Sequence, residues 1–404
     1  MTRRILIIAG EASGDLHGAY LARAIRVLAP TVRLVGLGGE AMRAAGVEIR
    51  LDSRDVGVVG ISELFSRLPL IWKAYHAATC MLRETPAPDL IVLIDCPGFN
   101  LRLAAVAKRL GVPVVYYIAP QVWAWRPQRL MTIRRVVDRL LVVLPFEEAF
   151  FRAAGVSCEF VGHPLLDEMG APDAPEVARR RFGLVSHRPV ISLLPGSRPQ
   201  EVARHLPLML AAATIMSREL TGLYALVALA PTISRDAVKL MVDRLNPTGV
   251  EVRIVAEDTG SCLAASDLAL VASGTATLQA ALSATPMVVI YRLSSFTYAI
   301  ARWLVRVPHI SLVNLIAAGG PTPGETPPAS DPGRGIVPEL IQDEATPQAI
   351  AVEALRCLRD STARASIAGG LQEVRRRVGA PGASARAAQA ILAMLSNGAG
   401  GTVR

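Results

Sequence analysis

Short apolar runs recur along the chain at intervals that leave room for a helix between them. In the first half, the runs that read as strands are residues 5–9, 32–35, 90–94, 114–118, 140–144 and 159–161. Stretches with the periodicity of an amphipathic helix, such as residues 19–28 and 101–110, lie between most of these runs. Strands that alternate with helices predict a parallel sheet covered by helices on both faces.

The alternation starts again after a stretch rich in Pro, Gly and acidic residues at 166–176. In the second half, the strand-like runs are residues 190–194, 224–230, 250–255, 268–271 and 287–291. The pattern predicts an α/β protein with two doubly wound domains, at residues 1–168 and 169–365. Because ligands of such domains bind at the carboxyl ends of the strands, we expect the sites to face a cleft between the domains.

The end of the chain is expected to be helical. Residues 346–394 are rich in Ala and Arg and have a helical pattern, and we group residues 366–404 as C-terminal helices with a frayed tail. The final helix is predicted to pack back on the first domain. Residues 319–335 contain five prolines and five glycines in 17 residues, which predicts an irregular loop inserted in the second domain.

Composition favours a folded protein with a basic surface. Hydrophobic residues make up 51% of the chain and charged residues 19%, and the formal net charge is +9. Such a charge suits phosphate-bearing partners, and since no nucleic-acid-binding motif is recognised we expect none of them to be a nucleic acid. The five cysteines are scattered and include no C-x-x-C pair, which argues for reduced thiols and against a zinc site. The uncharged run 268–291 is broken by Gly274 and Pro286, so it predicts strand, turn and helix instead of a membrane span.

Two turns in the second half predict anion sites. Gly196, Ser197 and Arg198 lie between a buried strand and a helix, where free N–H groups, the helix dipole and a guanidinium suit phosphate oxygens. Ser273, Gly274 and Thr275 form a similar strand-to-helix turn, and Gln279 lies one helical turn further, within reach of a ribose hydroxyl. The alternatives are a solvated arginine on a Pro-Gly turn and a simple serine cap.

In the first half, the candidate chemistry follows two strands. Asp95 comes directly after the apolar run 90–94, where burial would raise its proton affinity towards that of a general base. Asp95 could instead cap the helix expected near residue 101, although Asn100 fits that role better. Glu11 follows the first strand, and Ser13 or Asp15 can cap the first helix. The isolated His17 and His163 are interpreted as structural.

Apolar and aromatic residues alternate with cations in two further segments. They are Leu64, Phe65, Arg67, Leu68, Leu70, Ile71, Trp72 and Lys73 in one, and Trp123 and Trp125 in the other. Such segments can lie on an anionic membrane surface or hold an acyl chain. The alternative is a buried core with snorkelling cations.

Taken in order, these segments resemble the lipid-A-disaccharide synthase family. The matching stretches are GEASGD (10–15), GLGG (36–39), the ID-P-FN frame (94–100), YYIAPQVWAWR (116–126), LPFE (144–147), VGHPL (161–165), LLPGSR (193–198), SGTATL (273–278), PMVVIYR (286–292) and VPELIQ (337–342). The resemblance implies a GT-B fold and an inverting glycosyltransferase that uses no metal and no cofactor. It implies that UDP-2,3-diacylglucosamine and 2,3-diacylglucosamine 1-phosphate (lipid X) are joined through a β-1′,6 linkage with release of UDP. The expected place is the cytoplasmic face of the inner membrane of a Gram-negative bacterium.

The resemblance also assigns roles to individual residues, and at two positions this chain departs from the family's pattern. It places Glu11, Ser13 and Asn314 as substrate-orienting groups. Gly98 stands where the family usually has a second acid, and Gln279 stands where it commonly has Glu. Two alternatives stay open: a UDP-sugar epimerase of the same architecture, and a non-enzymatic protein that binds UDP-sugar at the membrane surface. The neutral residues Gly98 and Gln279 are what keep the second of these open. A homodimer is compatible with the sequence, which does not decide the oligomeric state.

Overall fold

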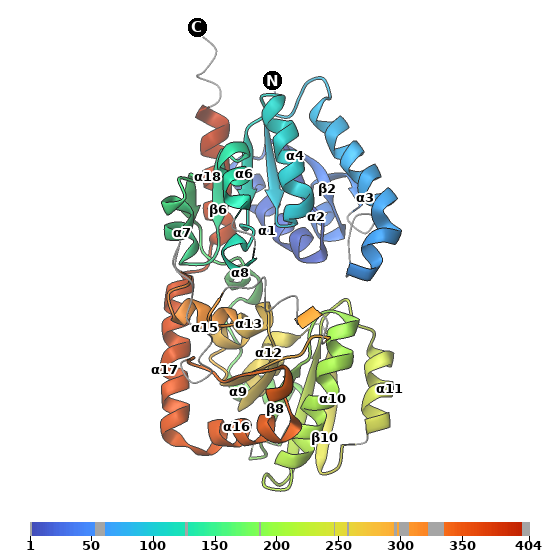
Figure 1. Cartoon of the computed structure of the whole chain (residues 1–404), viewed down its shortest axis with the longest axis vertical. Coiled ribbons are helices and arrows are strands. Elements are labelled where there is room, and N and C mark those ends of the chain that lie inside the picture. Colours follow the sequence, from blue (N-terminus) through green and yellow to red (C-terminus); the bar gives the residue numbers. More distant parts are fainter. Residues whose placement is uncertain are drawn as a thin grey trace. The chain divides into compact units, whose positions relative to one another are not determined.

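The computed structural model describes residues 2–52, 61–125, 128–185, 187–245, 247–256, 258–294, 297–298, 307–321 and 335–397, with only the backbone of 61–68. The chain forms two compact units (Figure 1). The first unit comprises Met1–Glu168 and Val378–Arg404, and the second comprises Met169–Arg377.

The first unit is built on a seven-stranded parallel sheet with the order β3-β2-β1-β4-β5-β6-β7. Its strands are β1 (Arg4–Ala9), β2 (Arg33–Gly38), β3 (Glu48–Asp52), β4 (Leu90–Ile94), β5 (Val114–Tyr117), β6 (Arg139–Val142) and β7 (Cys158–Phe160). Every residue of the central strand β4 is buried. Continuous apolar runs of this kind are typical of parallel strands that helices cover on both faces.

The helices of the first unit connect and cover these strands. They are α1 (Ala12–Leu28), α2 (Glu40–Ala44), α3 (Ile61–Leu82), α4 (Pro97–Arg109), α5 (Val122–Trp125), α6 (Arg129–Val136), α7 (Glu147–Ala153), α8 (Leu165–Met169) and α18 (Ala383–Asn397). As predicted, the final helix α18 packs on the first unit, where it lies beside α1 (Figure 1). Ala387, Ala388 and Ile391 are fully buried, and the small alanines let the two helices approach closely.

The second unit repeats the design with a six-stranded parallel sheet of order β10-β9-β8-β11-β12-β13. Its strands are β8 (Val190–Leu194), β9 (Leu223–Leu229), β10 (Val250–Ala256), β11 (Leu268–Ala272), β12 (Met287–Tyr291) and β13 (Glu339–Ile341). Its helices are α9 (Pro175–Arg181), α10 (Pro199–Met216), α11 (Arg235–Leu245), α12 (Thr259–Ala265), α13 (Thr275–Leu282), α15 (Leu312–Ala317), the short 3₁₀ helix η3 (Gln342–Glu344), α16 (Pro347–Arg359) and α17 (Ser361–Val378).

The predicted fold class of two doubly wound parallel sheets is confirmed. Two strands, β3 and β13, were not predicted. Both are edge strands that include charged or half-buried residues, so they lack the apolar runs of the central strands. The unit division falls after Glu168 and before Val378, which places α17 with the second unit, whereas the sequence pattern grouped residues 366–404 together. Most of the predicted loop 319–335 lies outside the described residues.

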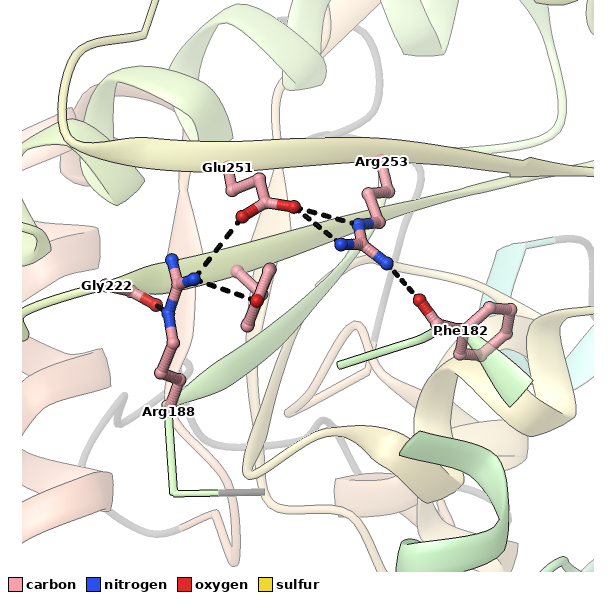
Figure 2. A network of polar contacts seen from close by, with 6 residues as sticks. Phe182, Arg188, Gly222, Glu251 and Arg253 are labelled. Atoms are coloured by element: carbon pink, nitrogen blue, oxygen red, sulfur yellow. Dashed lines mark hydrogen bonds and ion pairs between the residues drawn. The ribbon is translucent and has the colours of Figure 1, made fainter. Parts of the chain in front are cut away.

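Charged side chains occupy the edge strand β10 of the second sheet (Figure 2). The carboxylate of Glu251 lies between Arg188 and Arg253, accepting from Arg253 Nε at 3.1 Å and from Arg188 Nη1 at 3.4 Å. Both guanidinium groups lie over the ring of Tyr224, at 4.0 and 5.2 Å from its centroid. Charges of this kind discourage pairing with another strand. They lie towards the amino end of the sheet, because Val190, Tyr224 and Glu251 are neighbours in register.

No helix in the part of the chain that the structure describes is both long and apolar enough to cross a bilayer.

Candidate active site

The strand order reverses once in each sheet. In the first sheet this happens between β1 and β4, and in the second between β8 and β11. The carboxyl ends of parallel strands at such a switch point are where ligands of doubly wound folds bind. The segments that follow these four strands are 10–15, 95–100, 195–198 and 273–275, and the sequence analysis selected all four for their chemistry. Each sheet therefore brings two of the predicted segments together.

In the first unit, Glu11 and Asp95 follow neighbouring strands. Ala9 of β1 is directly opposite Ile94 of β4, so the two chains leave the sheet side by side. A Cβ on Gly10 would lie 3.2 Å from Cys96 Sγ, which shows how closely the two turns approach. Glu11 is the residue before α1 and is half-buried, and Ser13 is exposed in the first turn of that helix.

The turn at Asp95 is held in an unusual backbone conformation. Asp95 and Cys96 have φ values of +49° and +44°, in the left-handed region that non-glycine residues adopt at a cost of about 1–3 kcal/mol each. The buried Asn100 amide donates to the carbonyls of Ile94 at 3.0 Å and Asp95 at 2.7 Å. The hydroxyl of Tyr116 also donates to the Asp95 carbonyl. These three bonds fix the turn that carries the Asp95 carboxyl.

The role expected for Asn100 was wrong. Helix α4 begins at Pro97 rather than near residue 101, and no side chain in the described part of the chain caps it. Asn100 lies inside its first turn, where its amide reaches backwards to the strand end instead of forwards to free N–H groups. Asp95 does not cap the helix either, because the residue before α4 is Cys96.

The carboxyl of Asp95 is protonated more easily than a carboxyl in water. Burial raises its pKa, and the N–H of Cys96 and the nearby His17 partly oppose that shift. A carboxylate that gives up solvation is a stronger proton acceptor, as a general base requires. Burial also raises the pKa of Cys96 to about 11, so its thiol stays protonated at neutral pH and is a poor nucleophile.

Asp15 has a different role from the one expected. Its carboxylate accepts the N–H groups of Gly39 at 2.6 Å, Ala41 at 3.0 Å and Met42 at 3.1 Å. It therefore caps the neighbouring helix α2, and no side chain of the described residues caps α1. The GEASGD stretch thus combines a structural carboxylate, Asp15, with the candidate ligand group Glu11.

In the second unit, the first predicted anion site (the first cradle, Gly196–Arg198) is occupied by a carboxylate of the protein itself. Glu201 Oε2 accepts the N–H groups of Ser197 at 3.0 Å and Arg198 at 3.3 Å, and Oε1 lies 3.4 Å from Arg198 Nη1. Gly196 has φ +123°, and a Cβ there would lie 2.5 Å from Glu201 Oε2. The N–H groups and the guanidinium of the turn therefore contact a carboxylate of the chain itself, and phosphate binding at this turn stays a prediction. The sequence analysis missed Glu201, although its spacing of three residues from Arg198 is that of a capping box.

The second predicted anion site (the second cradle, Ser273–Thr275) is open. Gly274 precedes α13 with φ +141°, and apart from its chain neighbours no atom of the described residues lies within 4 Å of the position that a Cβ would take. No side chain from the described residues caps this helix, so the first N–H groups of α13 can receive an anion. Ser273 Oγ donates to the carbonyl of Ile310 at 2.8 Å, which fixes the start of the turn. Thr275 is exposed, and Gln279 is half-buried one turn further along.

Asn314 is used inside the protein. Its side chain donates to the Val337 carbonyl at 2.9 Å and to Glu339 at 2.7 Å, and it accepts the Val337 N–H at 3.1 Å. Only 1% of the residue is exposed. Glu339 also accepts the N–H of Ile310, whose carbonyl holds Ser273. The bonding of Asn314 supports an indirect role in shaping the Ser273 turn and does not support the expected contact with substrate.

The predicted membrane-facing residues divide into exposed and buried ones. Trp72 and Leu70 of α3 are 70% and 43% exposed, Lys73 is exposed and Ile71 is half-buried. The side chains of Leu64, Phe65, Arg67 and Leu68 lie outside the described residues.

The prediction for Trp123 was wrong, because its side chain is part of the core. Trp123 is 7% exposed and donates from Nε1 to Glu147 Oε1 at 3.0 Å. Glu147 also accepts the N–H groups of Val143 and Leu144, and burial raises its pKa to about 7. Trp125 is 40% exposed, with Arg129 over its ring. Of the two tryptophans, only Trp125 presents a large surface.

Within the described ranges, no three His, Cys, Asp or Glu side chains gather closely enough to hold a metal ion. All five cysteines are free thiols.

Known proteins with similar sequences cover almost the whole chain. Residues 5–394 match the family model described as lipid-A-disaccharide synthetase. The lipid-A-disaccharide synthase of Myxococcus xanthus is 44% identical over 98% of both chains, and that of Syntrophus aciditrophicus is 43% identical over 98% of both.

Solved structures with the same fold are much less similar in sequence. The MnaA–UDP co-structure from S. aureus has a TM-score of 0.64 at 12% identity, covering 98% of this chain and 97% of that one. The MurG structure from Acinetobacter baumannii has a TM-score of 0.59 at 15% identity, covering 97% of this chain and 100% of that one. These likenesses show the GT-B fold.

Proposed function

The chain belongs to the lipid-A-disaccharide synthetase family, and we infer from this premise which of its residues perform the reaction. It is a glycosyltransferase that condenses UDP-2,3-diacylglucosamine with lipid X to the β-1′,6-linked lipid A disaccharide 1-phosphate and UDP. One observation supports the residue assignments best: the four chemically distinctive segments follow the four strands at the two switch points.

The second unit binds the nucleotide of the donor. The diphosphate is held by the N–H groups at Gly196, Ser197 and Arg198 and by the turn Ser273–Thr275. Gln279 hydrogen-bonds the ribose. A carboxylate already occupies the first turn, so the diphosphate replaces Glu201 as the acceptor of the Ser197 and Arg198 N–H groups. The exposed guanidinium of Arg198 can turn from Glu201 to a phosphate without breaking any short bond.

The same groups stabilise the leaving group. As the bond between the sugar and the diphosphate breaks, negative charge accumulates on the phosphate oxygens. Arg198 and the amino ends of α10 and α13 offset this charge, which preorganised donors do most effectively. These protein groups supply the charge stabilisation that a divalent ion provides in other transferases.

The first unit binds lipid X and activates it. Asp95 accepts the proton of the acceptor 6-hydroxyl while the hydroxyl oxygen forms a bond to the anomeric carbon and UDP departs from the opposite side. This displacement inverts the configuration. Glu11 and Ser13 orient the acceptor beside Asp95, since the turns that carry Glu11 and Asp95 leave neighbouring strands. Proton acceptance by a positioned carboxylate contributes roughly 10²–10⁴-fold to such reactions.

Helix α3 and Trp125 place the enzyme at its lipid substrates. Trp72 and Leu70 present apolar surface next to the cation of Lys73, and Trp125 lies under Arg129. This combination suits the interface of an anionic membrane, where acyl chains and phosphate head groups are adjacent. We place the protein as a peripheral protein on the cytoplasmic face of the inner membrane.

One experiment tests the activity against both alternatives. Purified protein is incubated with UDP-2,3-diacylglucosamine, with and without lipid X, and released UDP and disaccharide are measured. We expect UDP and disaccharide in equal amounts and only when both substrates are present. Conversion of the nucleotide sugar without lipid X would indicate an epimerase. Binding without UDP release would indicate a non-enzymatic protein.

A further inference from the structure

Two side chains that are far apart in the sequence form an ion pair in the first unit. His17 lies on α1, and Glu168 lies on the short helix α8. Their atoms Nδ1 and Oε1 are 2.6 Å apart, and the two side chains are 16% and 14% exposed. Both atoms are shielded from solvent, and neither makes any other hydrogen bond among the described residues. A charge pair shielded in this way is screened little by salt.

Helix α1, which carries His17, packs against the strand that ends one residue before the candidate base. Gly14 and Gly18 face Ile94, the residue before Asp95, and Cβ atoms on the two glycines would lie 3.8 and 3.3 Å from its side chain. The absence of side chains on these glycines lets α1 approach the end of β4 closely. His17 lies between the two glycines in the sequence, and its charge reaches Asp95 and lowers the pKa of that carboxyl.

A second histidine near His17 remains neutral. His163 Nδ1 accepts the N–H of Leu165 at 3.2 Å, so the neutral ring carries its proton on Nε2. Burial lowers the pKa of His163 to about 3. Besides His17, the titratable and charged groups that face Asp95 or its immediate neighbours are Glu11, Cys96, Tyr116, Arg129, His163 and Glu168. Of these, Cys96, Tyr116 and His163 are neutral at pH 7 because burial disfavours their charged forms.

We propose that His17 is a positioning residue for the transfer reaction: Glu168 holds its imidazolium, and that positive charge keeps Asp95 ionised so that Asp95 can accept the proton of the acceptor hydroxyl. The inference rests on the proposed role of Asp95. Burial alone would leave a larger share of Asp95 protonated and therefore unable to accept a proton.

The test is the pH dependence of kcat/KM for His17→Gln, measured from roughly pH 5.5 to roughly pH 9 by UDP release. The acid limb of this profile reports the ionisation of the free enzyme's essential base. We expect the limb to move up by roughly one pH unit, as for loss of an opposite charge near a carboxyl. At a pH below the limb, activity then falls by about ten-fold, and at alkaline pH it returns towards the wild-type value.

Three companion variants sharpen the result. His17→Lys keeps a positive charge and should return the acid limb towards its wild-type position. Glu168→Gln should move the limb in the same direction as His17→Gln but by less, and it provides a second test if His17→Gln does not fold. The exposed His187 and Glu176 supply the matched controls His187→Gln and Glu176→Gln, which should leave the profile unchanged.

Two outcomes would overturn the inference. One is an acid limb of His17→Gln that superimposes on that of the wild type. The other is a loss of activity that is the same at every pH, since this indicates a purely structural role. Failure of the proposed function looks different: Asp95→Asn would then remain active, or the wild type would release no UDP.

Discussion

The two switch points are built in opposite ways. In the first unit the turn at Asp95 is half-buried and held by Asn100 and Tyr116, and its carboxyl has lost part of its solvation. In the second unit the side chain of Arg198 is 63% exposed, and its guanidinium lies 3.4 Å from Glu201. A group that accepts a proton gains from fixed geometry and desolvation. A group that must bind and release a nucleotide gains from a side chain that is exposed and that the nucleotide can reach. The same sheet topology therefore supports two kinds of site, and the difference lies in what surrounds the turns.

The largest effect should come from the half-buried switch point of the first unit. Asp95→Asn keeps the size of the side chain but removes the proton acceptor, so we expect turnover to fall by roughly 10²–10⁴-fold. UDP should bind as to the wild type, since Asp95 belongs to the other unit. Steady-state kinetics and calorimetric titration with UDP check the two parts. An Asp95→Asn enzyme with wild-type turnover would remove the contrast between the two switch points.

The exposed switch point should respond in binding. Arg198→Ala removes a charged donor to the diphosphate, for which a loss of about 1.5–3 kcal/mol is typical, or roughly 10- to 150-fold in UDP affinity. Arg198→Lys should recover only part of this, because an ammonium lacks the planar fork of a guanidinium. The exposed Arg218 provides the control variant Arg218→Ala. Unchanged UDP affinity in Arg198→Ala would refute the phosphate assignment.

The hydrogen bonds that hold the turn at Asp95 should also contribute to the stability of the protein. Asn100→Ala removes two hydrogen bonds that hold the turn, one of them fully buried, so we expect a loss of about 1–3 kcal/mol in the free energy of unfolding. Activity should fall as well, because the left-handed turn is then held only by Tyr116. Urea denaturation measures the first effect. A variant that unfolds like the wild type would show that the hydrogen bonds of Asn100 do not stabilise the turn.

The smallest effect concerns Glu201. Glu201→Gln removes the negative charge that occupies the first cradle, so UDP should bind more tightly, by about 3- to 10-fold or roughly 1 kcal/mol. Titration with UDP measures the change, and Glu219→Gln on the exposed surface serves as the control. Weaker binding would mean that Glu201 orients Arg198 for the phosphate instead of occupying its place.

Much of the architecture could be predicted from the order of apolar runs. The central strands β1, β4, β8 and β11 are continuous apolar segments, and each is followed by small or polar residues that are unusual at the end of a buried strand. The turns at Glu11, Asp95, Arg198 and Ser273 were therefore visible, and their roles stay predictions. The edge strands β3 and β13 were missed, because a strand with one open side need not be apolar throughout.

The partners of side chains could not be predicted in the same way. Trp123 lies in a segment with the composition of a membrane anchor, yet its indole is buried against Glu147. Asn100 has the position of a helix cap and instead bonds the strand behind it. In both cases the residue type allows either role, and packing decides between them.

The sequence by itself determined the two parallel sheets, the family and the segments that carry the chemistry, because apolar periodicity and short motifs are local properties of the chain. Only the tertiary structure decided which groups meet: His17 with Glu168, Asp15 with α2, and Asn314 with Glu339. These contacts join residues separated by many positions along the chain. Their energies depend on distance and burial, and neither is fixed until the strands have paired and the helices have packed on them.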